Sequence, residues 1–242
     1  MNNFNVIKFD ELESTNSYVT ENIESLKNLD VIVAKKQTSG RGRFDRIWNS
    51  DSDNLLMTIV IKPDDPKNFP YVKLTQYLSV IMTRVLKKKY FLDVTIKWPN
   101  DILANGKKTA GILCEGVNDK NGKLCAALGT GLNVNMEETE AKTLPNATSM
   151  KILTGKTFVT EDILNDIMFE FTKFYNEFAI KGFGGIIEEY TNLCKFTSKT
   201  VKITNSHQSG EFEPVGINFD GTLSVRDKDG KIIKILNGDI TC

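Results

Sequence analysis

The sequence has very few of the side chains that usually carry proton transfer or metal binding. His207 is the only histidine among 242 residues, and its polar surroundings, TNSHQSG, are typical of an exposed loop. The four cysteines form no CxxC pair and have no histidine at metal-ligand spacing; they are Cys114, Cys125, Cys194 and Cys242. These absences exclude a multi-histidine metal site, and they exclude a Ser-His-Asp or Cys-His triad unless His207 serves. Chemistry here must depend on lysine, arginine, carboxylates and the backbone.

The chain also lacks a charge excess, a signal peptide and a long apolar run. Lys+Arg and Asp+Glu each number 31, so the formal net charge is zero, whereas dedicated nucleic-acid binders usually carry a basic excess. The start, MNNFNVIKFDELES, does not have a charged segment followed by an apolar one, and no apolar stretch is long enough to span a bilayer. We therefore expect a cytoplasmic protein with no membrane or nucleic-acid partner.

Hydrophobic periodicity predicts alternating strands and helices over the first 195 residues. Strands are expected at 6–9, 31–34, 54–63 and 94–98, and a hairpin is expected around the turn signal Asn121-Gly122. Helices are expected from 14 to about 27, from 71 to 90, and from 160 to 178, where apolar residues recur at helical spacing. After Lys195 short strands and Asp-Gly turns predict a compact all-β module, too small to be robust alone and therefore docked on the first domain. The expected domains are 1–195 and 196–242.

The segment QTSGRGRFDRIW (37–48) is the most informative stretch of the chain. Three arginines, Arg41, Arg43 and Arg46, alternate with Gly40 and Gly42 directly after a predicted buried strand. Glycine allows close backbone approach to a ligand, and arginine donates to phosphate and carboxylate oxygens. A site for a small polyanion is one interpretation; a solvated basic loop or a patch for nucleic acid are the others.

Three further segments could take part in the same site. KWPND (97–101) places Asn100 and Asp101 at a strand end, where Asp101 could hold Mg²⁺, accept a proton or simply cap a turn. Lys108 is the first residue of KTAGILCEG. It could reach inward as a fixed ammonium, or it could be an ordinary lysine at the edge of the sheet. GTGLNVN (129–135) supplies a second glycine pair, and Asn133 could read an adenine edge.

Taken in order, these segments resemble the biotin protein ligases (biotin–[acetyl-CoA-carboxylase] ligases). The matching pieces are ESTNS (13–17), QTSGRGRFDRIW (37–48), KWPNDIL (97–103), KTAGILCEG (108–116) and GTGLNVN (129–135), and the C-terminal GINFDGTLSV and NGDI are similar to that family's SH3-like domain. The resemblance covers essentially the whole chain. It implies an α+β fold: a mixed β-sheet with flanking helices, of the class II synthetase-like biotin ligase type, plus a small C-terminal SH3-like all-β domain.

The same resemblance implies an activity. Such enzymes make biotinyl-5′-AMP from biotin and ATP, with Mg²⁺, and pass the biotin to one lysine of the biotin carboxyl carrier domain of a carboxylase. The chain would be a monofunctional ligase without an N-terminal DNA-binding domain, and a homodimer is plausible. A lipoate–protein ligase with the same acyl-adenylate logic, a non-catalytic biotin or nucleotide sensor, and nucleic-acid binding remain the alternatives.

Residue by residue, the resemblance implies three overlapping groups. The biotin-binding group is Ser14, Thr15, Asn16, Gln37, Gly40, Arg41, Gly42, Arg43, Lys108 and Gly111. The ATP-binding group is Arg41, Arg43, Arg46, Trp48, Asn100, Lys108 and Asn133. The catalytic group is Lys108, Arg43 and Asp101, with Asp101 also the candidate for Mg²⁺ or for the acceptor lysine. The loop departs from the family's common GRGRRGR at Phe44 and Asp45, which puts loop closure and retention of the intermediate in doubt.

Overall fold

A seven-stranded mixed sheet forms the centre of the computed structural model, which describes residues 4–241 except 45, 49–51, 145, 197–199, 205–208 and 237. The strands are β1 (Asn5–Leu12), β2 (Asp30–Gln37), β3 (Leu55–Ile61), β4 (Val94–Lys97), β5 (Asp101–Ala104), β6 (Lys107–Asn118) and β7 (Leu124–Leu132). Their order is β1-β2-β3-β7-β6-β5-β4, with β1 and β2 parallel and the other neighbours antiparallel. All seven residues of β3 are buried, as expected for a strand covered on both faces.

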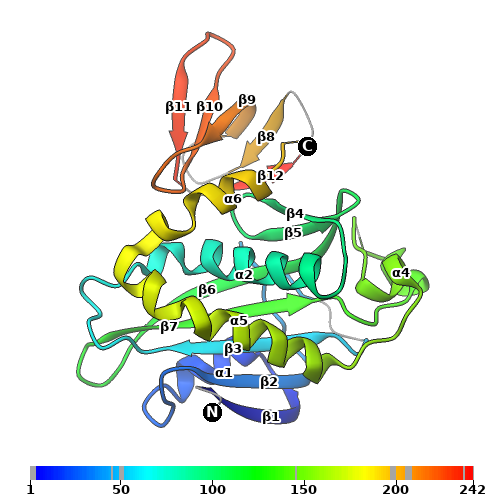
Figure 1. Ribbon diagram of the computed structural model, residues 1–242, viewed down its shortest axis with the longest axis vertical. Helices are drawn as coiled ribbons and strands as arrows, with labels where there is room; N and C mark the ends of the chain where they lie inside the picture. The colour runs from blue at the N-terminus through cyan, green and yellow to red at the C-terminus, as the bar shows by residue number, and fades with distance from the viewer. Residues whose placement is uncertain are drawn as a thin grey trace.

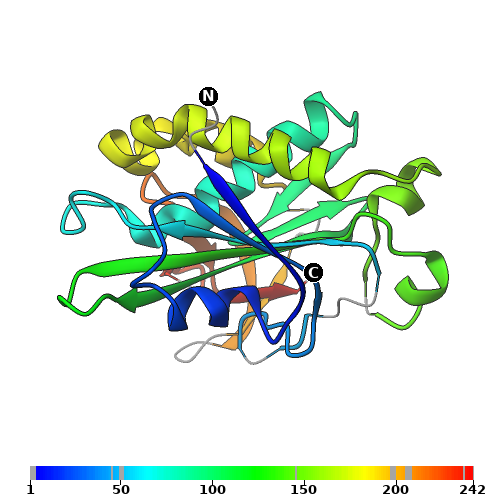
Figure 2. The same cartoon turned by 90° about the horizontal axis from the view of Figure 1, so that it is seen from below.

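Helices cover both faces of this sheet (Figures 1 and 2). On one face lie α2 (Leu74–Lys88) and α5 (Thr160–Lys181), whose apolar stripes join the main hydrophobic core, and α6 (Ile187–Leu193) continues that layer. On the other face lies α1 (Thr15–Glu21), where Val19 belongs to a separate cluster with Ile32, Val60, Cys125 and Ala127. The short helices are α3 (Glu138–Ala141), α4 (Met150–Thr154), η1 (Tyr71–Lys73) and η2 (Gly182–Gly185). None of the described helices has both the length and the apolarity needed to cross a membrane.

The C-terminal strands form a second, antiparallel sheet that docks on the first unit (Figure 1). They are β8 (Val201–Thr204), β9 (Ser209–Ile217), β10 (Leu223–Arg226), β11 (Ile232–Ile235) and β12 (Asp239–Thr241), in the order β11-β10-β9-β8-β12. Their buried apolar side chains belong to the main core. In addition, Trp98 Nε1 and Gln76 Nε2 both donate to the carbonyl of Gly221, at 3.0 and 2.7 Å. The predicted fold class and the docking are confirmed, while a domain boundary near residue 195 stays a prediction.

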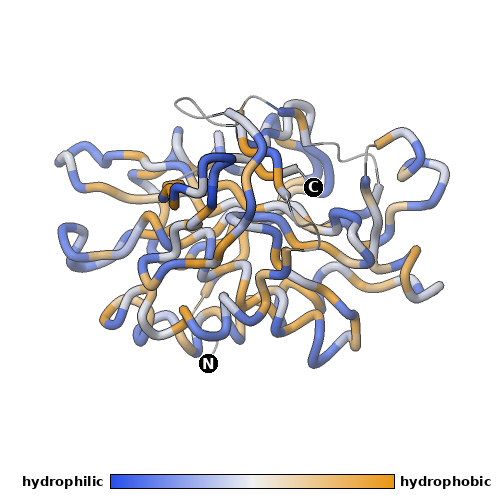
Figure 3. The backbone as a smooth tube through the Cα atoms, turned by 90° about the horizontal axis from the view of Figure 1, so that it is seen from above, coloured by the Kyte–Doolittle hydropathy of each residue, from blue (hydrophilic) through white to orange (hydrophobic). Residues whose placement is uncertain are grey.

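The sequence prediction differs from the structure mainly at short elements. The first helix ends at Glu21 instead of extending to about residue 27; the backbone N–H and the side-chain amide of the C-cap residue Asn22 both donate to the Tyr18 carbonyl, at 3.0 and 2.9 Å. Apolar residues after it, such as Ile23 and Leu26, stay buried without being helical. Strands β5 and β12 and helix α6 are too short to give a clear periodic signal. Hydrophobic segments otherwise gather inside, and the peripheral loops are mostly hydrophilic (Figure 3).

Candidate functional site

The start of α1 places three small polar side chains inside the molecule. Ser14 is the N-cap residue, with extended backbone and a hydroxyl that accepts from the backbone N–H of Ser17 at 3.4 Å. Ser14, Thr15 and Asn16 are only 4–5% exposed. Buried hydroxyls and amides need hydrogen-bond partners, so their partners define what this part of the site can bind.

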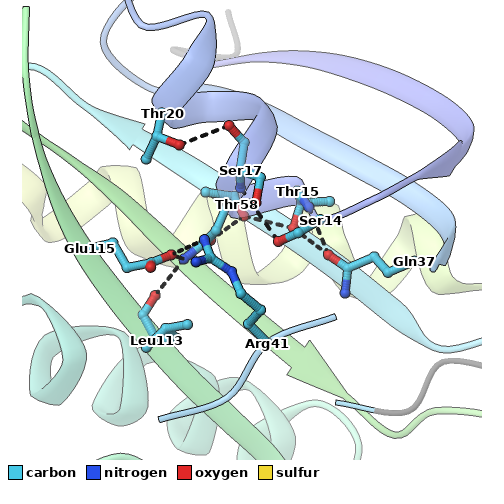
Figure 4. A network of polar contacts seen from close by, with 10 residues as sticks. Ser14, Thr15, Ser17, Thr20, Gln37, Arg41, Thr58, Leu113 and Glu115 are labelled. Atoms are coloured by element: carbon cyan, nitrogen blue, oxygen red, sulfur yellow. Dashed lines mark hydrogen bonds and ion pairs between the residues drawn. The ribbon is translucent and has the colours of Figure 1, made fainter. Parts of the chain in front are cut away.

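Those partners come from two neighbouring strands (Figure 4). Gln37, at the end of β2, accepts through Oε1 from the backbone N–H of Thr15 at 2.7 Å and from its hydroxyl at 3.0 Å. Thr58, fully buried in the middle of β3, has its hydroxyl 2.8 Å from the Thr15 hydroxyl and 2.7 Å from Asn16 Oδ1. We call Ser14, Thr15, Asn16, Gln37 and Thr58 the neutral end of the site. Its side chains are uncharged, and all but Ser14 are hydrogen-bonded to one another.

Glu115 on β6 lies behind the neutral end. Its Oε2 accepts from Asn16 Nδ2 at 2.7 Å and from Arg41 Nη2 at 3.0 Å (Figure 4). The same Asn16 amide donates to the Leu113 carbonyl at 3.4 Å. Arg41, predicted for both substrates, is therefore ion-paired at this end of the site, although its side chain is 47% exposed.

Glycines of β6 and β7 leave room for these side chains. A Cβ on Gly129 would overlap the amide oxygen of Asn16, and one on Gly131 would overlap the indole of Trp48. A Cβ on Gly111 would stand 2.9 Å from Lys108 Cε and 3.0 Å from Trp48 Cζ3. Bare backbone is thus required on this wall because other side chains already pack against it.

The opposite end of the site is cationic. Lys108 lies next to a register shift in the β5–β6 pairing, and its Nζ lies 2.7 Å from Asp101 Oδ1 and 5.5 Å from the centre of a Trp48 ring. Asp101 also has Lys97 Nζ 3.8 Å from its second oxygen. Its carboxylate is therefore shared by two lysines. This pairing keeps the Lys108 side chain beside the indole.

Arg43 is the second cation at this end. Its Nη1 donates to Asn100 Oδ1 at 2.9 Å and to the carbonyl of Gly238 at 3.2 Å, and its guanidinium lies 5.0 Å from the centre of the Phe44 ring. The Asn100 amide in turn donates to the Ile112 carbonyl at 3.0 Å. Because Gly238 directly precedes β12, the C-terminal sheet contributes to the placement of this arginine. We call Arg43, Lys108, Asn100 and Asp101 the cationic end.

The Gly-Arg loop that carries Arg41 and Arg43 folds back on itself. Arg41 pairs with Ile47 in an antiparallel bridge, the N–H of Gly42 donates to the Arg46 carbonyl at 2.7 Å, and the N–H of Trp48 donates to the Gly40 carbonyl at 2.9 Å. Phe44 has a φ of 55°, in the left-handed region where most residues are strained. At the departure from the common loop pattern, Phe44 thus takes a left-handed conformation, and the expected effect on loop closure stays a prediction. Asp45 and His207 lie outside the described residues.

Residues of both ends, Thr58 and Asp101 excepted, line one small cavity of about 50 Å³. Eleven of the predicted site residues line it: Ser14, Thr15, Asn16, Gln37, Arg41, Gly42, Arg43, Trp48, Asn100, Lys108 and Gly111. Ligand sites usually enclose about 300–1,000 Å³, so a sizeable ligand requires side chains to move. Trp48 fits that role, because its Nε1 is buried and has no acceptor within the part of the chain that the structure describes.

Four predicted residues do not line the cavity. Gly40 and Arg46 hold the loop through their carbonyls, and Asp101 lies behind Lys108. Asn133 is buried, and its amide donates to the Thr148 carbonyl at 3.0 Å while its N–H donates to the Thr109 carbonyl at 2.8 Å. It joins two chain segments, so its amide is already occupied in this structure.

The sequence pattern did not point to Thr58 or Glu115, whereas it did mark Gly129 and Gly131, the wall glycines, as the glycine pair of GTGLNVN. Thr58 carried a usable signal, since it is the one polar residue in the otherwise apolar LLMTIVI of β3. Glu115 carried none, because an acidic residue near the end of a strand is usually solvated. Cys114, its neighbour, is no candidate nucleophile: burial, with a smaller contribution from Glu115, raises the pKa of its thiol to about 12.

Comparison with known proteins relates this cavity to a family. A family model described as the biotin/lipoate A/B protein ligase family matches residues 7–133, the range that contains every cavity-lining residue. The bifunctional ligase/repressor BirA of Bacillus subtilis (strain 168) is 33% identical over 218 residues, which cover 87% of this chain but 65% of that protein. The biotin–[acetyl-CoA-carboxylase] ligase of Paracoccus denitrificans is 27% identical over 230 residues, covering 90% of this chain and 93% of that protein.

A solved structure agrees with these relatives. The biotin protein ligase from Aquifex aeolicus in complex with biotin and ATP matches with a TM-score of 0.83 and 26% identity, over 98% of this chain and 97% of that one. The similarity therefore includes the C-terminal sheet as well as the region that the family model matches.

Proposed function

Because the chain belongs to the biotin/lipoate A/B protein ligase family, we propose that it is an ATP-dependent biotin–protein ligase. In this proposal it makes biotinyl-5′-AMP from biotin and ATP. It then transfers the biotin to a specific lysine of the biotin carboxyl carrier domain of acetyl-CoA carboxylase or a related carboxylase.

The observation that carries the proposal is the polarity of one cavity. The neutral end supplies hydroxyls and amides, which suit a ureido ring that has two N–H donors and one carbonyl acceptor. The cationic end supplies Arg43 and Lys108, which suit a carboxylate and the phosphate it attacks. A small acid with a neutral polar ring and a flexible tail fits this arrangement lengthwise.

The first step joins two anions, so charge repulsion is its main obstacle. An oxygen of the biotin carboxylate attacks the α-phosphorus of ATP, the bond to the bridging oxygen breaks, and pyrophosphate leaves. Lys108 and Arg43 would neutralise the carboxylate and the phosphoryl oxygens as negative charge builds up between them. For that, Lys108 exchanges its contact with Asp101 for a contact with the substrate.

The second step depends more on the exclusion of water from the site than on the neutralisation of charge. The neutral ε-amine of the acceptor lysine attacks the acyl carbon, the mixed anhydride bond breaks, AMP leaves with the electron pair, and the new amide nitrogen releases its extra proton to solvent. An activated acyl group is also open to hydrolysis, so the site must hold it behind a cover until the amine arrives. The Gly-Arg loop, with Trp48 against the wall glycines, is the cover that we propose.

Mg²⁺ is expected with ATP, but Asp101 does not fit as its ligand. Its carboxylate is already shared by Lys108 and Lys97, and the described residues contain no group of three or more His, Cys, Asp or Glu that could hold a metal. We therefore propose that Asp101 positions Lys108. For Asn133, we propose that it shapes the wall of the nucleotide side of the site, with Arg46 and Gly40 maintaining the loop.

The remaining proposals concern the molecule as a whole. We expect the cytoplasm as its location, a functional division near residue 195, and a homodimer. Size-exclusion chromatography with light scattering, with and without biotin and ATP, tests the dimer: a mass that stays at the monomer value up to high protein concentration contradicts it.

Intact-mass analysis of a purified carboxylase carrier domain tests the function. With the enzyme, biotin and ATP, we expect a mass gain of one biotinyl group on the carrier domain and release of pyrophosphate. A carrier domain whose acceptor lysine is replaced by arginine is the control and stays unmodified.

Two outcomes contradict the proposal in different ways. Binding of biotin without pyrophosphate release or transfer points to a sensor. Transfer of lipoate to a lipoyl domain, without binding of biotin, points to the lipoate branch of the same family.

A further inference from the structure

Glu115 connects Asn16, which lines the cavity, to the Gly-Arg loop through a single oxygen atom. Its Oε2 accepts from Asn16, which is 4% exposed at the start of α1, and from Arg41 on the loop. The Glu115 side chain is 28% exposed and does not itself line the cavity. It therefore acts on a ligand only through the two residues that it holds.

The first of these actions is to orient the Asn16 amide. A carboxylate without a proton can only accept, so the NH₂ group of Asn16 must face Glu115 and its carbonyl oxygen must face Thr58. Gly129 has no Cβ at the point where this oxygen lies, so the backbone accommodates the same orientation. Asn16 thus presents a fixed pattern of donor and acceptor at the neutral end.

Glu115 also changes the distribution of positive charge along the cavity. Arg41 is one of three cavity-lining cations, with Arg43 and Lys108, and Glu115 pairs with Arg41 at the neutral end. The Arg41–Glu115 pair has little net charge, whereas at the cationic end the single carboxylate of Asp101 is shared by Lys97 and Lys108, so positive potential remains mainly there. A substrate anion is then attracted to Arg43 and Lys108, and its uncharged ring is directed to Asn16.

We propose that Glu115 is a positioning residue that sets the direction in which the acid substrate binds, by fixing the Asn16 amide and by neutralising Arg41. This inference rests on the proposed function and extends it to substrate selection. Loss of Glu115 weakens recognition of the neutral ring and leaves recognition of ATP in place.

The test compares Glu115→Gln and Glu115→Ala with wild type, using titration calorimetry for biotin without ATP and steady-state pyrophosphate release for the two KM values. Hydrogen bonds to charged groups have net free energies of about 1.5–3 kcal/mol, so the alanine variant should bind biotin about tenfold or more weakly, with the KM for ATP changed by less than about threefold. The glutamine variant retains an acceptor for Asn16, so its Kd for biotin should lie between those of the wild type and of the alanine variant.

A matched control is Glu213→Gln, which removes the charge from another exposed Glu–Arg pair, with Arg226 at 3.2 Å in the C-terminal sheet. It should leave both KM values unchanged. The background variant Arg41→Met tests the charge argument: the Glu115→Gln effect on biotin binding should shrink there, because Arg41 is no longer available to be neutralised.

Several results overturn the inference. They are an unchanged biotin Kd in both Glu115 variants, an equal rise in the two KM values, or a fall in melting temperature with unaltered biotin binding. If the alanine variant does not fold, the glutamine variant decides alone. A wild-type chain that binds no biotin contradicts the proposed function instead, so the two failures are distinguishable.

Discussion

The two ends of the cavity are built differently. At the neutral end, Thr15, Asn16 and Thr58 are nearly or fully buried and bind one another and Gln37 in a closed chain of hydrogen bonds. At the cationic end, Lys108 and Arg43 are held by partners that a substrate can replace, namely the Asp101 carboxylate and the Asn100 amide. Recognition thus depends on a preformed framework, whereas the chemistry depends on side chains that exchange partners.

The difference follows from what each end has to stabilise. A neutral ring gains most from hydrogen-bonding groups that are already oriented, because little entropy is then lost on binding. Developing charge gains most from cations that are positioned before the reaction, and a bound carboxylate keeps such cations in place until the substrate arrives. Substitutions at the two ends should therefore separate binding of biotin from turnover.

The largest effect is expected for Lys108→Ala. Removal of a fixed cation from the reaction centre should lower kcat for biotinyl-adenylate formation about 10²–10³-fold, whereas biotin binding should weaken much less. Single-turnover formation of the adenylate measures the first quantity and calorimetry the second. The control is Lys107→Ala, which removes the neighbouring exposed lysine. An equal loss in the control would show that the effect is not specific to Lys108.

Substitutions of the wall glycines should have different effects at the two ends of the cavity. Gly129→Ala places a methyl group against Asn16, and Gly131→Ala places one against Trp48. Since overpacking costs about 1–3 kcal/mol, the first should weaken biotin binding about tenfold or more, and the second should mainly raise the KM for ATP. Gly116→Ala is the control, because its Cβ would meet Leu124 at an ordinary 3.5 Å. Identical profiles for the first two variants would contradict the assignment of separate ends.

Asp101→Asn tests how Lys108 is positioned. Loss of the carboxylate should lower kcat by about tenfold, an amount typical of the coupling between two side chains in one ion pair. The Mg²⁺ concentration that gives half the maximal rate should stay the same, and a Mg²⁺ titration of the variant measures it. A large increase in that concentration would instead establish Asp101 as a metal ligand.

Thr58→Val is expected to act on the framework itself. The substitution keeps the shape of the side chain but removes a buried hydroxyl that bonds Thr15 or Asn16, so the free energy of unfolding should fall by about 1–3 kcal/mol and biotin should bind several-fold more weakly. Denaturant unfolding measures the first. Thr83→Val is the matched control, because the Thr83 hydroxyl is also buried but has no partner within the described chain. A similar loss of stability in both variants would contradict the role of the hydrogen bonds.

The smallest effect concerns Cys114, beside Glu115 on β6. Burial raises the pKa of its thiol to about 12, so the thiol stays protonated as the pH rises past the range in which an exposed cysteine ionises, about 8.5. Alkylation by iodoacetamide, followed by peptide mass spectrometry, should therefore remain slow in the folded protein up to about pH 10. In denaturant the same residue should react readily. Rapid reaction of the folded protein would show that this part of β6 opens.

The sequence predicts the elements and most of the cavity, for identifiable reasons. Long periodic segments such as α5 and alternating or apolar strands such as β3 carry their own signal, and the Gly-Arg loop concentrates unusual residue types in one place. Glu115 could not be found in this way, because its importance comes from two hydrogen bonds to residues 99 and 74 positions away. The contact of Arg43 with Gly238, 195 positions away, is equally invisible to a local pattern.

The role of Asp101 shows the same limit. From the sequence alone, its place after a strand favours a turn cap over a metal site or a proton acceptor. The positioning role that we propose is supported by the distance of 2.7 Å between Lys108 Nζ and the carboxylate, next to a register shift between β5 and β6.

A crystal structure of the protein with biotin bound, in the absence of ATP, tests the central claim most directly. The account predicts the ureido ring within hydrogen-bond distance of Thr15 and Asn16, and the carboxylate directed to Arg43 and Lys108, with Arg41 still paired with Glu115. A biotin bound in the reverse direction, with its carboxylate on Arg41, would contradict it.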